Sequence, residues 1–188
     1  TDASAPEGQI HFRSSGHLTA DTIPIVMLHQ TASSSAMWEK VMSLLDDGMS
    51  AIAFDTPGFG NSYDPEGYMT IKELSEVIVQ AANDLGVQNF HLLGHHTGVC
   101  LAAEIAVAHP ERVKSAMMIG PVPLTSEERE EFRDHFSTPF SPDQSGDYLR
   151  TTWEYLSNLA GTEAMPLELL HREVLDTVRA HQGRFLTC

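Results

Sequence analysis

Short apolar runs alternate with helix-spaced apolar side chains along the first two thirds of the chain. Apolar runs of this length predict buried strands, and an alternating apolar–polar segment predicts one further strand ahead of them. The strands expected from these patterns cover residues 9–13, 23–28, 50–54, 89–93 and 113–119. Strands that alternate with helices favour parallel βαβ units. The expected fold is therefore α/β, a three-layer sandwich with a mostly parallel sheet.

The helix boundaries carry recognisable capping signals. A first helix, with Trp38 among its apolar residues, is expected to begin at a cap formed by Ser34 or Ser35. A second is expected from residue 71, because Thr70 followed by Glu73 forms the T-x-x-E capping box, and Gly86 is placed to end it. A third is expected over residues 99–108, before Pro110.

The pattern changes after Pro123. Thr125 and Glu128 predict the start of an acidic helix that runs to about residue 135, and amphipathic helices are expected over residues 148–159 and 166–181. No further strand and no internal repeat is predicted. The expected organisation is an α/β core over residues 1–124, followed by a helical cap or lid over residues 125–188.

Charge and composition exclude several classes of function. The chain has 188 residues with 11 basic and 26 acidic side chains, a net charge of −15, which disfavours nucleic acid and anionic membranes as partners. No apolar run approaches a membrane span, and the N-terminal residues 1–8 lack the basic-then-apolar pattern of a signal peptide. Two cysteines do not make a disulfide framework. A cytoplasmic protein that binds a small-molecule substrate is expected.

One pentapeptide carries the chemistry. Residues 94–98 read Gly-His-His-Thr-Gly, between a predicted strand and a predicted helix. This is the G-x-nucleophile-x-G frame of a nucleophile elbow, a sharp turn that needs small flanking residues so that the central side chain stands above the sheet. The glycines fit that requirement, and the central residue is His96 where serine is usual.

Three further motifs lie at the ends of other predicted strands. His29-Gln30 follows a predicted strand, residues 55–62 read D-T-P-G-F-G-N-S, and residues 109–113 read H-P-E-R-V. Together with the pentapeptide, these motifs resemble the α/β-hydrolase superfamily over residues 9–124. The resemblance implies that His29-Gln30 lies at the oxyanion loop and that the helical tail is a cap inserted after the sixth strand. That family places its catalytic acid and histidine after a seventh and an eighth strand, so neither role is carried over to a residue here.

His96 has three interpretations. An imidazole is a competent nucleophile, it can act as a general base on water, or it can remain as a polar group in a pocket that no longer hydrolyses anything. The resemblance implies an oxyanion hole built from the backbone amides of Thr97 and of Gln30 or Thr31. Alternatively, these amides simply cap the following helix.

Other polar residues near these motifs are candidates for lining the pocket. They are His29, His95 and Asp55. Structural roles are the favoured interpretation, with the histidines hydrogen-bonding near the elbow and Asp55 capping its own turn. The hydroxyl of Thr97 stands one position too late to attack a substrate. No metal site is expected, because ligand spacing is absent, and the Gly58-Phe59-Gly60 turn implies no cofactor.

The resulting hypothesis is hydrolysis of a small ester, lactone or related carbonyl compound through His96 and a backbone oxyanion hole. The alternatives are a ligand-binding module that has lost the chemistry and an inactive fragment of a longer hydrolase. If the chain is such a fragment, residues 113–119 leave an unpaired apolar sheet edge, through which another copy or the missing piece is expected to associate. Pocket shape, and with it the substrate, is not encoded in any local pattern.

Overall fold

The fold was taken from a computed structural model, which describes residues 2–5, 8–19, 21–121, 123–128, 130–131, 142–159 and 165–180. This part of the chain forms one six-stranded sheet in the order β1-β2-β4-β3-β5-β6. The pairs β1–β2 and β2–β4 are antiparallel, whereas β4–β3, β3–β5 and β5–β6 are parallel. The strands are β1 (Asp2–Ala5), β2 (Gly8–Ser15), β3 (Ile25–Leu28), β4 (Ala51–Phe54), β5 (Phe90–His95) and β6 (Val113–Ile119).

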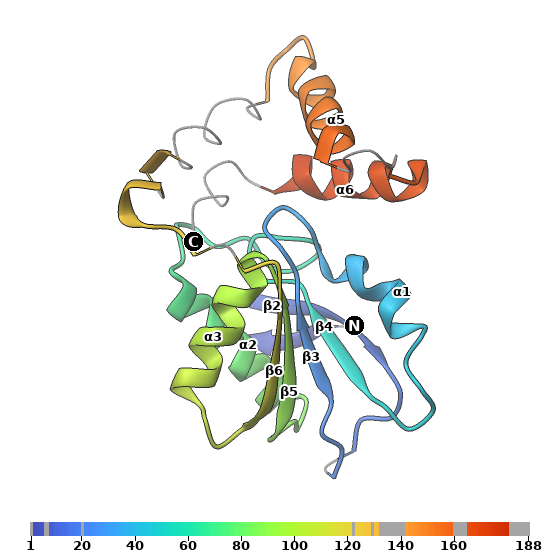
Figure 1. The fold of residues 1–188 in the computed structure, drawn as a ribbon, viewed down its shortest axis with the longest axis vertical. Helices are drawn as coiled ribbons and strands as arrows, with labels where there is room; N and C mark the ends of the chain where they lie inside the picture. Colours follow the sequence, from blue (N-terminus) through green and yellow to red (C-terminus); the bar gives the residue numbers. More distant parts are fainter. Residues whose placement is uncertain are drawn as a thin grey trace.

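Helices cover both faces of the sheet, as Figure 1 shows. On one face lie α2 (Ile71–Asp84) and α3 (Thr97–Ala108), and on the other lie the 3₁₀ helix η1 (Ser35–Trp38) and the short α1 (Glu39–Met42). The C-terminal helices α5 (Asp147–Leu159) and α6 (Leu167–Arg179) lie beyond the carboxyl ends of the parallel strands. The expected three-layer α/β sandwich with a mostly parallel sheet is confirmed.

The two faces of the sheet differ in the number of apolar side chains that they bury. Under α2 and α3, side chains such as Val26, Ile52 and Leu92 join one large core cluster. The opposite face has a smaller cluster, in which Met27, Trp38 and Leu93 pack together. Large apolar area is therefore removed from water mainly on the α2/α3 side, which makes that layer the principal source of hydrophobic stability.

The capping signals were predicted correctly. Thr70 and Glu73 form the reciprocal capping box of α2, and Gly86 adopts a φ of +74° where that helix ends. Ser34 caps η1, since its side chain accepts a hydrogen bond from the amide of Ala36. The caps formed by Thr70 and Ser34 each satisfy an amide that has no partner inside the helix, and Gly86 allows the left-handed turn that ends α2.

Three elements differ from the expectation. Strand β1 was not predicted, and it is held by antiparallel pairing with β2 rather than by an apolar run of its own. The first expected helix is a 3₁₀ turn followed by only four α-helical residues. Strand β5 extends two residues further than predicted, through Gly94 and His95, because both pair with β6.

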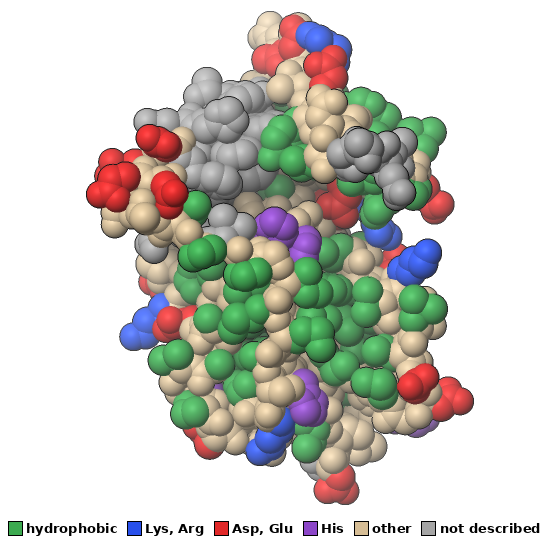
Figure 2. Space-filling model, in the orientation of Figure 1, with side chains coloured by type: hydrophobic (Ala, Val, Ile, Leu, Met, Phe, Trp, Pro, Cys, Tyr) green, Lys and Arg blue, Asp and Glu red, His purple; other side chains and the backbone are tan. Residues whose placement is uncertain are grey.

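Strand β6 is the most exposed strand. Within the described residues it pairs only with β5, and every residue from Lys114 to Ile119 is exposed. Residues 113–119 were predicted as a buried strand, and for Met117 and Met118 that prediction was wrong, because they are 62% and 44% exposed. Figure 2 shows apolar side chains over this side of the sheet. The apolar edge is present as expected, and association through it stays a prediction.

Beyond residue 123 the regular elements of the described residues are helices. Thr125 and Glu128 exchange the expected capping-box hydrogen bonds, and residues 126–128 and 130–131 are helical. Residues 129, 132–135 and 181 of the expected helices lie outside the described residues, and the boundary at residue 124 stays a prediction. Among the helices in the described part of the chain, none combines the length and apolar character needed to cross a membrane.

Candidate active site

The turn between β5 and α3 is centred on His96. His96 has φ of 48° and ψ of −112°, a left-handed conformation that a residue with a Cβ adopts only under constraint, and its side chain is exposed. A Cβ on Gly94 would overlap the carbonyl of Gly98, and a Cβ on Gly98 would overlap the carbonyl oxygen of Leu28 in β3. The two glycines are therefore required for α3 to start directly above the sheet with His96 at its N-terminus.

The ring of His96 lies between two neighbours. A Cβ built on Gly120, just after β6, would stand 3.0 Å from Nε2 of His96. On the other side, the His95 ring meets the His96 ring edge-on, with their centroids 4.5 Å apart. The imidazole of His96 is thus confined by β6 and by its own neighbour in sequence, while remaining open to solvent.

His95 was expected to be a structural hydrogen-bonding residue, but one of its two ring nitrogens has no partner. Its Nδ1 is buried without a hydrogen-bond partner, and so is Nε1 of Trp38, whose ring lies 6.4 Å from that of His95. Burial lowers the pKa of His95, and the proximity of His96 lowers it further. His95 is therefore a neutral ring that packs beside His96.

The loop after β3, residues 29–35 (the β3 loop), lies against the N-terminus of α3. The Thr31 and Thr97 hydroxyls are 2.5 Å apart, and the Thr31 amide donates to Oγ1 of Thr97 at 3.3 Å. The Thr97 hydroxyl therefore points at the β3 loop, a contact that the sequence did not reveal. In the same loop Ala32 has a φ of +65°, a conformation that costs about 1 kcal/mol or more for a residue other than glycine.

His29 has the structural role that was expected of it. Its Nε2 accepts the Thr56 amide at 3.0 Å and lies 3.1 Å from the Thr56 hydroxyl, while its Nδ1 lies 2.7 Å from the carbonyl oxygen of Gln30. Because Nε2 accepts an amide hydrogen, the proton sits on Nδ1 and the ring is neutral. Burial lowers the pKa of His29, although the Gln30 carbonyl and two nearby carboxylates oppose this shift.

Asp55 is fully buried at the end of β4. Its Oδ1 accepts the Ser35 amide at 2.6 Å and its Oδ2 accepts the Asn61 amide at 2.8 Å. The Asp55 carbonyl also accepts the Ser62 hydroxyl. These contacts are those of a turn-capping residue that ties the β3 loop to the glycine-containing turn at residues 57–60, and its lining of a substrate pocket stays a prediction.

Sequence reasoning missed the side chains that α6 contributes next to the β3 loop. Glu173, Asp176 and Thr177 are buried against Ala32, Ser33 and Ser34. Burial raises the pKa of Glu173, and Asp176 beside it acts in the same direction. The only available signal was polar residues at i, i+3 and i+4 on an amphipathic helix, a pattern that normally marks a solvated face.

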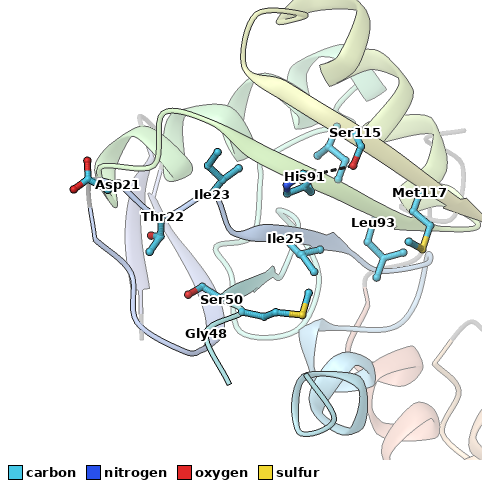
Figure 3. A pocket seen from close by; sticks show the side chains of 12 residues that line it. Asp21, Thr22, Ile23, Ile25, Gly48, Ser50, His91, Leu93, Ser115 and Met117 are labelled. Atoms are coloured by element: carbon cyan, nitrogen blue, oxygen red, sulfur yellow. Dashed lines mark hydrogen bonds between the residues drawn. The ribbon is translucent and has the colours of Figure 1, made fainter. Parts of the chain in front are cut away.

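A separate groove lies at the other end of the sheet. It has a volume of about 570 Å³ and opens at the amino ends of β3 and β5, where Ile25, His91 and Met117 contribute to its lining (Figure 3). His91 points across it to Ser115, with Nδ1 2.8 Å from Oγ. Because His96 follows the opposite, carboxyl end of β5, this groove is not the site around His96.

The structure thus brings most of the candidate residues together. Through Thr97 and Thr31, the turn at His96 meets the β3 loop, and His29 and Asp55 hold that loop from behind. Thr31 differs from the expectation, since its amide already has an acceptor in Thr97. Within the described ranges, no three His, Cys, Asp or Glu side chains come together in a way that would bind a metal ion.

Known proteins resemble this chain in sequence. An abhydrolase domain-containing protein, abhd-5.2 of Caenorhabditis elegans, is 32% identical over 104 residues, which cover 52% of this chain and 23% of that protein. A pimeloyl-[acyl-carrier protein] methyl ester esterase of Yersinia enterocolitica is 27% identical over 143 residues, which cover 74% of this chain and 54% of the esterase. The chain therefore spans between about a quarter and about half of the length of these relatives.

Solved structures show the same fold. The epoxide hydrolase CorEH superposes with a TM-score of 0.78 at 18% identity, covering all of this chain and 72% of that enzyme. The enol-lactonase of Burkholderia xenovorans superposes with a TM-score of 0.77 at 15% identity, covering all of this chain and 71% of that enzyme. The family model of the alpha/beta hydrolase fold matches residues 23–160. With this match and the geometry at His96, the chain belongs to the alpha/beta hydrolase fold family.

Proposed function

We propose that the protein hydrolyses a small ester, a lactone or a related carbonyl compound at the turn centred on His96. The observation that carries the proposal is the constrained turn itself, which exposes an imidazole at the N-terminus of α3 beside the β3 loop. The similarity to a methyl ester esterase and the shared fold of an enol-lactonase favour hydrolysis over a pure ligand-binding role. In this proposal the turn is a nucleophile elbow.

In the proposed reaction His96 is the general base. A ring nitrogen of His96 accepts a proton from water as the water oxygen bonds to the carbonyl carbon of the substrate. The tetrahedral intermediate then collapses, the bond to the alkoxy oxygen breaks, and the leaving alkoxide takes the proton back from the imidazolium. Direct attack by His96, with an acyl-imidazole intermediate, is the alternative route.

Backbone amides would stabilise the oxyanion. The amide of Thr97 is the first in α3 and has no acceptor within the helix, so it and the helix dipole favour negative charge above it. The Gln30 amide would be the second donor, because the Thr31 amide is engaged by Thr97. The β3 loop is then the oxyanion loop, and α5 and α6 form the cap that shapes the substrate pocket.

The test compares His96→Ala with the unchanged chain on short-chain p-nitrophenyl esters and on a simple γ-lactone. General-base catalysis contributes about a hundredfold or more, so kcat/KM should fall by at least about that factor. His91→Ala, on the same strand but at its amino end, is the matched control and should leave turnover unchanged. Equal rates in the His96→Ala protein and the unchanged chain would refute the assignment, and an acyl group captured on His96 would assign direct attack instead.

A further inference from the structure

Helix α6 is attached to the β3 loop by three side chains from one of its faces. Asp176 accepts a hydrogen bond from the Ser34 hydroxyl at 2.6 Å, and the Thr177 hydroxyl donates to the carbonyl of Ala32 at 3.3 Å. Glu173 completes the set, since its Oε1 lies 3.4 Å from the Ser33 hydroxyl. Residues at i, i+3 and i+4 share one helical face, so three consecutive loop residues are held by a single helix.

The adjoining face of α6 makes a different kind of contact. Leu170 and Val174 pack with Leu156 of α5 in a small apolar cluster. This cluster packs α6 against α5 and is separate from the two core clusters of the sheet. The polar face of α6, buried against the β3 loop, joins α6 to the core, together with an outer ion pair between Arg172 and Glu39 at 2.9 Å and a hydrogen bond from Arg179 to Asn61 at 3.1 Å.

The Asp176 contact is transmitted along the β3 loop through Ser34. The Ser34 hydroxyl donates to Asp176 and at the same time accepts the amide of Ala36, the capping bond of η1. A hydroxyl has one hydrogen, and Ser34 directs that hydrogen at Asp176. The lone pairs of the Ser34 oxygen are thereby left to accept the Ala36 amide. A carboxylate acceptor makes this bond stronger than one between neutral groups.

From these contacts we infer that Glu173, Asp176 and Thr177 are positioning residues, which hold the β3 loop in the conformation that presents its amides to the turn at His96. The inference rests on the proposed function, because it assigns those amides a catalytic task. It makes α6 part of the active-site framework rather than only a roof over it. Ala32, in its left-handed conformation, is the residue whose backbone this contact holds in place.

The charge on Glu173 makes the attachment dependent on pH. Burial raises the pKa of Glu173 above its ordinary value of 4.5, with Asp176 adding to the effect and Ser33 and Arg172 opposing it. Across the interface, the titratable groups of the core are Asp55 and the neutral His29, and Glu39 faces it through its ion pair with Arg172. The contribution of Glu173 to the attachment is complete below pH 4.5 and is lost as pH rises through the raised pKa of Glu173.

The test measures amide hydrogen exchange in the β3 loop of the whole chain, together with ester turnover. Asp176→Ala should speed exchange at the amides of Ser35 and Ala36 by about tenfold, the equivalent of one lost charge-assisted hydrogen bond. Turnover should show a lower kcat with little change in KM. Asp176→Asn, whose side chain still offers an oxygen to Ser34, should restore most of both, and Glu168→Gln on the exposed side of α6 should change neither.

Two further measurements keep the result decisive. Exchange at α2 amides reports on global unfolding, and if Asp176→Ala unfolds, Thr177→Val gives the same test with a neutral side chain. Glu173→Gln should flatten the pH dependence of the protection factors in the β3 loop, which are exchange rates corrected for the intrinsic effect of pH. Unchanged exchange at Ser35 and Ala36 in both Asp176→Ala and Thr177→Val would overturn the inference. Absence of turnover in every protein, with exchange altered as expected, would overturn the proposed function and leave the attachment itself established.

Discussion

Two segments meet at the candidate site, and different forces hold them. The turn at His96 is shaped by backbone sterics, since Gly94 and Gly98 leave room for carbonyl oxygens that any Cβ would overlap. The β3 loop is shaped by side chains from distant parts of the chain, among them Asp55 and Asp176. The turn is therefore expected to tolerate no Cβ at either glycine. The β3 loop can instead be weakened in steps, because its hydrogen bonds can be removed one at a time.

The largest effect is expected at the rigid segment. Gly98→Ala forces a methyl group into the carbonyl oxygen of Leu28, a backbone atom that cannot move without disturbing β3. We expect a loss of more than about 4 kcal/mol in the free energy of unfolding, measured by urea denaturation, or failure to fold. Gly67→Ala is the control, because its Cβ would meet open space, and it should change stability by less than about 0.5 kcal/mol. Near-native stability of Gly98→Ala would show that the turn is not sterically fixed.

The next largest effect is expected in the β3 loop. Asp55→Ala leaves the amides of Ser35 and Asn61 buried without their acceptor, at an expected loss of about 3 kcal/mol in the free energy of unfolding. Asp55→Asn retains one acceptor oxygen and should lie between the two proteins. Urea denaturation measures the series. A loss in Asp55→Ala as large as that in Gly98→Ala would erase the distinction between the two segments.

The smallest effect concerns the protonation of His29. Burial lowers the pKa of His29 in the folded protein, so the unfolded chain takes up this proton first as pH falls. The contribution of neutral His29 to stability is complete above pH 6.5 and is lost as pH falls toward the lowered pKa. His29→Gln offers an oxygen near the position of Nε2 without titrating, so its stability should fall less steeply between pH 7 and 5. Parallel stability curves for the two proteins would contradict the neutral assignment of His29.

The same contrast explains what the sequence could predict. Gly94, His96 and Gly98 lie within five residues, so a steric requirement leaves a readable local signature, and the turn was found in the correct place. Ser34 and Asp176 are separated by 142 positions, and a hydrogen bond between such residues leaves no periodicity or spacing. The helical tail was predicted as helices, but its polar attachment to the β3 loop was not.

The exposure of β6 marks a second limit. The run at residues 113–119 was correctly predicted as a strand, because its apolar content is a local property. Its exposure was not predicted for Met117 and Met118, since burial depends on which other elements cover a strand. Strand identity can be inferred from a few residues, whereas coverage is a property of the whole sheet.

The contact between His96 and Gly120 has a consequence for redesign. Gly120 has a φ of +61°, and a Cβ there would stand 3.0 Å from Nε2 of the imidazole. Glycine at position 120, which belongs to neither the turn nor the β3 loop, thus leaves the space that the His96 ring occupies. A side chain at position 120 would press on the imidazole and would also strain its own backbone, so redesign around His96 has to keep this glycine.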